Sequence, residues 1–225
     1  MVEFHTGKLD VDGLMGAGLH VLAQNERQYF SSPGAAIAAV AHPKQAHWLP
    51  MFPQQGLKPR DRDRGDAVTR AVFVGCRHQL DRSLQAPAFV RKLKDELGVD
   101  LDVVHKGRAQ EWRDYAAADV VVAVREADPG LHVAKPPSKI INAWLAGVPA
   151  ILGRESAPRS LRTNDLDFVE VDATPDAVFA ALAKMKRDPA YYAQLRARCD
   201  VKAAEFSRAA LAKKWADLID EIRPR

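Results

Sequence analysis

Two lysines and a serine lie close together at the start of one short segment, residues 135–155, which reads KPPSKIINAWLAGVPAILGRE. Lys135 and Lys139 carry full positive charges, and Ser138 stands where a helix is predicted to start, a common place for a capping hydroxyl. The first backbone N–H groups of a helix have no partner within it, and the helix dipole is positive there. These features favour the binding of an anionic group. The other interpretation is an ordinary capped helix with solvated lysines.

The elements that hold these side chains are predicted by the same segment. Two prolines prevent a helix before Ser138, and Gly147 ends the helix predicted from Lys139 to Ala146. One face of that helix is apolar and carries Ile140, Ile141, Trp144 and Leu145. The apolar run from Pro149 to Leu152 predicts a buried strand of a parallel sheet. Helix and strand together make half of a βαβ unit.

This segment resembles the donor-binding region of GT-B glycosyltransferases, in which a loop, a helix and a strand hold a nucleotide sugar. The matching residues are Pro137, Ser138, Lys139, Ile140, Ala146, Gly147 and Pro149. The resemblance covers approximately residues 67–222. It implies an α/β fold with a Rossmann-like parallel sheet flanked by helices, of the GT-B C-terminal-domain type. Such enzymes pair two Rossmann-like domains and bind the donor mostly in the C-terminal one.

Seven residues are candidates for binding the donor diphosphate or nucleoside. They are Gly75, Arg77, Lys135, Ser138, Lys139, Asn142 and Glu155. Gly75 ends a predicted strand, and ligands of doubly wound folds sit at such strand-to-loop turns. The resemblance places the first donor-binding loop there, so that Arg77 would meet the diphosphate. His78 in the same loop is more often a plain surface or core histidine than a base.

Two of these candidates have a structural alternative. Asn142 lies one turn beyond Ser138 and can offer its amide to a ribose or phosphate oxygen, or bond to backbone within the core. Glu155 can bind a ribose hydroxyl, as acidic residues do after Rossmann strands, or pair on the surface with Arg154 or Arg159.

No catalytic residue is assigned. Many retaining members of the family carry two acids around this loop and helix, and the corresponding positions here are Ala134 and Asn142. A general base for an inverting reaction would come from the acceptor side, where His5 and His20 are available, although a lone histidine is usually structural. A DxD-like pair after a strand is missing, since Asp61 and Asp63 fall in a linker, so neither a metal site nor a cofactor is expected.

Composition is that of an ordinary soluble globular protein. The 225 residues are 47% hydrophobic and 28% charged, with a net charge of +4 that suits an anionic ligand. No apolar run approaches the roughly 20 residues of a membrane span, and no signal peptide is evident, so a cytoplasmic location is expected. Cys76 and Cys199 are expected to be free thiols. In the basic run at 58–66, KPRDRDRGD, acids alternate with bases, which favours a solvated linker over a nucleic-acid contact.

The chain is predicted to have three parts. These are a shortened N-terminal α/β lobe at 1–57, a linker at 58–66, and a Rossmann-like nucleotide-sugar-binding domain with C-terminal helices at 67–225. Within the lobe we expect a strand and loop over residues 1–18, strands at 19–23 and 48–52, and a helix at 34–41. A complete GT-B N-terminal domain would need about 100 residues or more, which puts catalysis by a lone monomer in question. A homodimer or a partner subunit could complete the acceptor site.

Strands and helices alternate in the third part. Strands are predicted at 69–74, 101–104, 119–124, 149–152 and 168–171, and helices at 89–97, 111–118 and 139–146, from Thr174 onward and over 189–222. The spacing demands crossover connections and hence a parallel sheet. In proteins of the GT-B type the last helix crosses back onto the N-terminal lobe, and the resemblance implies that this contact is buried here by Leu211, Trp215, Leu218 and Ile222.

The leading hypothesis is a glycosyltransferase-like protein, of the hexosyltransferase type, that binds a nucleotide diphosphate sugar and transfers the sugar to an unknown acceptor. The second keeps the fold but not the catalysis, and makes the chain a nucleotide-sugar-binding module or a subunit that needs a partner. A regulatory domain resembling a response-regulator receiver would need an acidic cluster at the sheet edge. A dinucleotide oxidoreductase would need G-x-G-x-x-G after the strand at 69–74. Neither feature is present.

Overall fold

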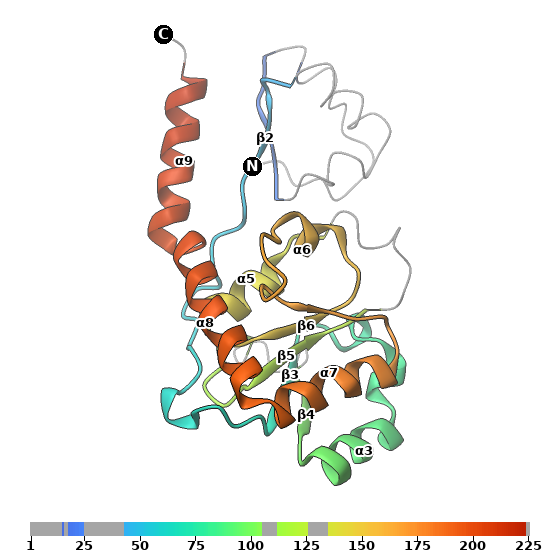
Figure 1. Cartoon of the computed structure of the whole chain (residues 1–225). Coiled ribbons are helices and arrows are strands. Elements are labelled where there is room, and N and C mark those ends of the chain that lie inside the picture. Colours follow the sequence, from blue (N-terminus) through green and yellow to red (C-terminus); the bar gives the residue numbers. More distant parts are fainter. Residues whose placement is uncertain (1–14, 16–17, 25–42, 105–111, 126–134, 224–225) are drawn as a thin grey trace.

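A sheet of five parallel strands occupies the centre of the described part of the chain (Figure 1). The structure, a computed structural model, describes residues 15, 18–24, 43–104, 112–125 and 135–223. The strand order is β4-β3-β5-β6-β7, with β3 at Arg70–Val74, β4 at Asp100–Val104, β5 at Val120–Ala123, β6 at Ala150–Leu152 and β7 at Val169–Glu170. The predicted α/β fold with a Rossmann-like sheet is confirmed, and each strand lies within one residue of its predicted bounds.

Helices cover both faces of this sheet. Helices α3 and α7 lie on one face and α5 on the other, while α8 runs across the edge of the layers (Figure 1). The helices are α3 at Pro87–Leu97, α5 at Ser138–Leu145, α6 at Ser156–Ser160, α7 at Pro175–Arg187, α8 at Pro189–Glu205 and α9 at Arg208–Ile222. Short 3-10 turns are η2 at Arg62–Arg64, η3 at Arg77–Gln79 and η4 at Arg82–Gln85.

Several helix boundaries follow from local chemistry. Thr174 caps α7 by accepting a hydrogen bond from the Ala177 N–H, and Pro175 occupies the first helical position, as predicted. Gly98 ends α3 in the left-handed conformation, with φ of 62°, which glycine adopts without steric cost. The same helix begins two residues before its predicted start because Pro87 also suits the first helical position.

The apolar stripe of α5 forms part of the core between the sheet and α8. Ile140, Ile141 and Trp144 are buried, and the indole N–H of Trp144 donates to the Asp167 carbonyl at 2.7 Å. Trp144 also lies against Phe206 at the end of α8, with ring centroids 5.3 Å apart. The helix is therefore anchored along its length, and its first turn is held in place relative to the sheet.

The N-terminal region contributes a second, smaller sheet. Strands β1 (Val21–Ala23) and β2 (Ala46–Trp48) pair in parallel. The predicted strand at 48–52 is wrong in position, because β2 ends at Trp48 and Pro50 has no N–H to continue the pairing. The strand and loop expected over residues 1–18, apart from the few of these that are described, and the helix expected at 34–41 lie outside the described residues.

Residues 58–66 are tied to the larger sheet at several points. The Arg60 N–H donates to the Ala146 carbonyl, and the Arg60 side chain is buried and paired with Asp119 at 2.9 Å. Asp119 is itself fully buried just before β5 and also accepts from Arg64 at 2.7 Å. The expected solvation of this segment holds for Asp61 and for most of its neighbours, which are exposed, but not for Arg60.

The helix predicted at 111–118 is wrong over its described residues, 112–118. Lys58 and Asp114 instead form a parallel β-bridge, and the Tyr115 N–H donates to the Lys58 carbonyl at 3.0 Å. Asp114 accepts from the Ala116 N–H, a local turn that competes with helix formation. Pairing with residues 57–61 thus takes the place of helical hydrogen bonds.

The predicted helical tail is two helices, α8 and α9, which Phe206 and Ser207 separate. Ser207 caps α9 by accepting from the Ala210 N–H. Helix α9 leaves the sheet and runs beside the chain that leads from β2 (Figure 1). In the described ranges, every helix is too short or too polar to cross a membrane.

Candidate functional site

The ends of three parallel strands and the start of α5 meet at one edge of the sheet. Gly75 directly follows β3, Arg125 follows β5 and Glu155 follows β6, so the strand directions bring all three to the carboxyl edge. Lys139 lies in the first turn of α5, which connects β5 and β6. We call the side chains of Arg125, Lys135, Lys139 and Glu155 the edge cluster.

Gly75 allows Lys139 to approach the backbone of β3. Its φ is 149°, and a Cβ atom built on it would lie 3.2 Å from the Lys139 Nζ atom and 3.3 Å from the Phe73 ring. The ammonium group also donates a hydrogen bond to the Gln79 Oε1 atom at 3.3 Å. A side chain at position 75 would displace Lys139, so the glycine is required by the close packing.

Glu155 is paired within the site and not on the surface. Its Oε2 atom accepts from the Arg125 Nη1 atom at 2.7 Å, and only 8% of the Arg125 side chain and 12% of the Glu155 side chain are exposed. The predicted alternative, a pair with Arg154 or Arg159, is wrong because those arginines pair with Asp172 and Glu170. Arg125 is not among the seven candidates proposed from the sequence.

Arg125 retains unused hydrogen-bonding capacity. Its Nε atom is buried and has no hydrogen-bond partner among the described residues. A buried N–H without a partner costs free energy, and such groups in native proteins call for an explanation. A ligand oxygen at this edge would provide the missing acceptor.

Positive charge exceeds negative charge in the edge cluster. Burial lowers the pKa of Lys139 to about 8, and the neighbouring cations Arg125 and Lys135 act in the same direction, against Glu155. Burial likewise raises the pKa of Glu155, against the effect of Arg125, Lys139 and Lys135. Three cations thus face one carboxylate, and an anion would relieve their mutual repulsion.

Ser138 does not cap the helix as predicted. Pro137 occupies the cap position and Ser138 is already the first helical residue, so its hydroxyl makes no capping hydrogen bond. The Pro137 carbonyl accepts the first helical bond from the Ile141 N–H at 3.2 Å. Proline offers no side-chain acceptor for the first N–H groups of α5, so these N–H groups have no capping side chain.

Two predicted residues have hydrogen-bond partners outside the edge cluster. The Arg77 Nε atom donates to the Gln85 side chain at 2.7 Å, and Gln85 in turn donates to the Arg77 carbonyl. Asn142 is buried and its Oδ1 atom accepts from the Gln54 N–H at 3.1 Å, which is the backbone contact given above as its alternative role. Neither Arg77 nor Asn142 contacts Lys139 or Glu155 in any described interaction.

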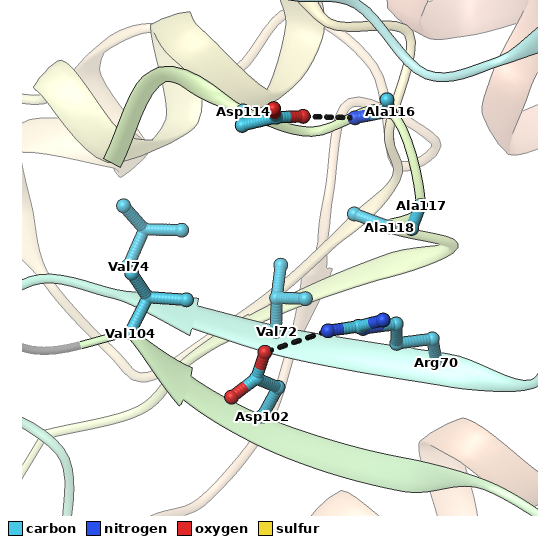
Figure 2. Close-up of a pocket in the computed structure, with 9 residues that line it drawn as sticks. All are labelled: Arg70, Val72, Val74, Asp102, Val104, Asp114, Ala116, Ala117 and Ala118. Atoms are coloured by element: carbon cyan, nitrogen blue, oxygen red, sulfur yellow. Dashed lines mark hydrogen bonds and ion pairs between the residues drawn. The ribbon is translucent and has the colours of Figure 1, made fainter. Parts of the chain in front are cut away.

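A cavity of about 380 Å³ lies beside β3 and β4, apart from the edge cluster (Figure 2). Its walls are side chains along one face of β3 and β4, together with Asp114 and the three alanines at 116–118. The polar groups in its wall pair with protein partners, as Arg70 does with Asp102 at 2.8 Å and Asp114 with the Ala116 N–H (Figure 2). None of the seven predicted site residues lines this cavity.

The candidate bases belong to the N-terminal region. His5 lies outside the described residues, while His20 is exposed and its Nδ1 atom lies 2.7 Å from the His47 Nε2 atom. In the portion of the chain that is described, no group of three or more His, Cys, Asp or Glu side chains is placed to hold a metal ion. The two cysteines are free thiols, as expected.

No protein-family model matches the chain, and no curated protein matches its sequence. Solved structures do match. The sucrose-phosphate synthase of Thermosynechococcus elongatus superposes with a TM-score of 0.60 and 17% identity, over 98% of this chain and 64% of its own. HepE of Anabaena, in complex with UDP and glucose, gives a TM-score of 0.60 and 11% identity, over 89% of this chain and 62% of its own.

A glycosyltransferase from Rickettsia africae gives a TM-score of 0.61 and 10% identity, over all of this chain and 69% of its own. At these identities the likeness establishes the fold, and it confirms the predicted GT-B glycosyltransferase fold. The chain spans 64% of the length of the synthase. The remaining third of that protein has no counterpart here, in keeping with the short N-terminal region expected from the sequence.

Proposed function

We propose that this protein binds a nucleotide diphosphate sugar at the carboxyl edge of its sheet and transfers the sugar to an acceptor. The observation that carries the proposal is the edge cluster, in which three cations face one carboxylate and the Arg125 Nε atom has no hydrogen-bond partner in the described ranges. A diphosphate supplies both the negative charge and the oxygen acceptors that this arrangement lacks. The structural neighbours support it, since one of them was solved with UDP and glucose.

In the proposed complex, the diphosphate lies between Lys139 and the start of α5. The uncapped N–H groups of the first turn, at Ser138 and Lys139, point toward this position. Lys135 and Arg125 add charge from the two sides of the loop that precedes the helix. Arg77 and Asn142 stay candidates for further contacts, because the hydrogen bonds to Gln85 and Gln54 use only the Arg77 Nε atom and the Asn142 Oδ1 atom.

These cations act on the leaving group. Transfer breaks the bond between the anomeric carbon and the β-phosphate oxygen, while a new bond forms between that carbon and an acceptor oxygen. The acceptor proton passes to a base, and the diphosphate leaves with one more negative charge than it carried as the donor. Fixed cations in a partly buried site stabilise that developing charge more strongly than water does. The charge is met by side chains and helix N–H groups in place of a metal.

Calorimetric titration tests the binding step. UDP, GDP, ADP, dTDP and the corresponding nucleotide sugars are titrated into the protein and into Lys139→Met. We expect at least one base to bind, and Lys139→Met to weaken that binding about 10- to 100-fold, the loss of one charge-assisted contact. The matched control is Lys94→Met on α3, which removes an ammonium group that pairs with Asp100 of β4. We expect it to leave the affinity unchanged. Absence of binding by all of these ligands to folded protein would contradict the proposal.

A non-catalytic role, in which the chain binds a nucleotide sugar without transferring the sugar, is the second candidate. The two candidates differ in turnover. Release of nucleoside diphosphate from a bound nucleotide sugar, by hydrolysis or by transfer to added sugars, supports the transferase, whereas binding without release supports a binding subunit.

A further inference from the structure

Glu155 stands in an unusual position for a carboxylate. It is nearly buried, it follows β6 at the edge of the sheet, Arg125 pairs with it at 2.7 Å, and the charges of Lys139 and Lys135 also act to lower its pKa. An anionic group at an anion site opposes binding, so its presence there needs a reason beyond affinity. Holding Arg125 is one part of that reason, but a neutral amide can accept the same hydrogen bond.

The two ligands of a sugar transfer differ in charge at this place. A nucleotide sugar carries two charges on its diphosphate. The nucleoside diphosphate released from it ends in a phosphate monoester, whose second ionisation has a pKa near 6, and so carries close to three charges above about pH 7. A site with a large excess of positive charge would hold the product more tightly than the donor. Each turnover would then wait on product release.

We propose that Glu155 determines the preference of the site between these two ligands, by removing one positive charge from the edge cluster. This inference rests on the proposed function. The carboxylate repels the more highly charged product more than the donor, and it does so strongly because the cluster is shielded from water. The site thereby keeps enough positive charge to bind a nucleotide sugar, while its affinity for the nucleoside diphosphate is lowered.

The test compares dissociation constants for UDP and UDP-glucose, with GDP and GDP-mannose as a second pair, in the wild type and in Glu155→Gln. Glutamine keeps an acceptor for Arg125 but removes the charge. We expect the ratio of the two constants to change by about 3- to 30-fold in favour of the nucleoside diphosphate, the range for one unit charge acting over roughly 8 Å in a partly shielded site. The change in ratio should shrink at high salt, because the effect is electrostatic.

Two further variants separate charge from structure. Glu155→Asp keeps the charge and shortens the side chain. It should therefore weaken the binding of both ligands and leave the ratio of their dissociation constants as in the wild type. Glu170→Gln removes a carboxylate that pairs with a different arginine, Arg159, and should leave both constants unchanged.

The inference is overturned if Glu155→Gln leaves the ratio unchanged, or if it weakens both ligands equally, as a purely structural residue would. It is also overturned if Glu155→Asp changes the ratio as much as Glu155→Gln does. When the wild type binds a nucleotide pair and only the ratio fails to respond, the proposed function survives and the role of Glu155 does not. When the wild type binds none of the four ligands, both fail.

Discussion

Lys139 combines the features that the candidate site needs, namely a position at the start of α5, a close approach to Gly75 and a neighbourhood rich in positive charge. Burial and nearby cations lower the pKa of its ammonium group to about 8 in the free protein. A bound diphosphate favours the charged form and raises that pKa again. Binding therefore takes up a proton wherever the free lysine is partly neutral.

This coupling predicts how affinity depends on pH. The affinity for UDP-glucose, whose phosphates stay ionised over the range, should be constant below about pH 7 and fall by up to tenfold per pH unit above about pH 8. Titrations in buffers of different ionisation enthalpy would count the proton taken up. Lys139→Met should bind weakly with no such dependence. A wild-type affinity that stays level up to about pH 9.5 would contradict the role given to Lys139.

Lys139→Met is informative because it should not unfold the protein. The folded state holds the ammonium group in an environment that disfavours its charge, so a neutral side chain of similar length removes an unfavourable term. A loss of binding with unchanged thermal stability would then reflect lost contact with the ligand.

Candidate site residues could be proposed from the sequence only where a local sequence pattern pointed to them. Lys135, Ser138 and Lys139 stand within one segment, and the helix-start pattern was enough to propose them. Arg125 and Glu155 are 30 residues apart and come together only because β5 and β6 are adjacent in the sheet. Nothing local to either residue indicates that pair. Ser138 was misplaced by one position, because the dihedral angles at Pro137 decide which residue is the cap.

At the scale of elements, apolar periodicity and residues that begin or end helices and strands were enough to predict the elements that are determined locally. Strands β3, β5 and β6 are mostly apolar runs, and α7 begins at a threonine followed by proline. The predictions were wrong where the structure of a segment depends on pairing with a distant segment. Residues 112–118 have helix-forming alanines, yet hydrogen bonds to residues 58–61 take the place of an α-helix there. Strand β2 lies before its predicted place because its partner is β1.

Asp119 connects the segment at 58–66 to the start of β5, and its removal should be costly. Asp119→Asn leaves the buried Arg60 without its countercharge, which we expect to lower the free energy of unfolding by about 3–5 kcal/mol. Chemical denaturation would measure the change. Asp217→Asn breaks an exposed pair with Lys213 on α9 and should cost no more than about 0.5 kcal/mol. Equal effects of the two substitutions would contradict the role given to Asp119.

The same carboxylate predicts a dependence of stability on pH. Burial alone would raise the pKa of Asp119, but hydrogen bonds from Arg64, Thr69 and Arg70 prevail and hold it at about 2. Because the folded pKa lies below the unfolded value, the unfolded state binds more protons at low pH. The stabilisation, about 2 kcal/mol, is present above about pH 5 and is lost as the pH falls toward 2. In Asp119→Asn that part of the acid sensitivity should disappear.

At the scale of the whole molecule, α9 connects the larger sheet to the N-terminal region. Leu211 is fully buried and Leu218 nearly so, as predicted for the crossing helix. Trp215 stacks on Phe52 with ring centroids 6.3 Å apart and an angle of 12° between the planes. Farther along, Glu221 raises the pKa of His47 in β2, against the stronger lowering by burial and by His20. The crossing of the last helix was expected from the resemblance. The residues that α9 contacts were not predicted, because they lie in a segment without apolar periodicity.

The stack of Phe52 on Trp215 should carry measurable coupling between the two regions. A double-mutant cycle with Phe52→Ala, Trp215→Ala and the double variant isolates the interaction from the loss of each side chain alone. Stacked rings of this kind contribute about 0.5–1.5 kcal/mol beyond the area they bury, and we expect the lower half of that range because Phe52 is 47% exposed. Free energies of unfolding from denaturant titration would give the coupling. Strict additivity would mean that α9 and the chain after β2 lie together at this stack without stabilising each other.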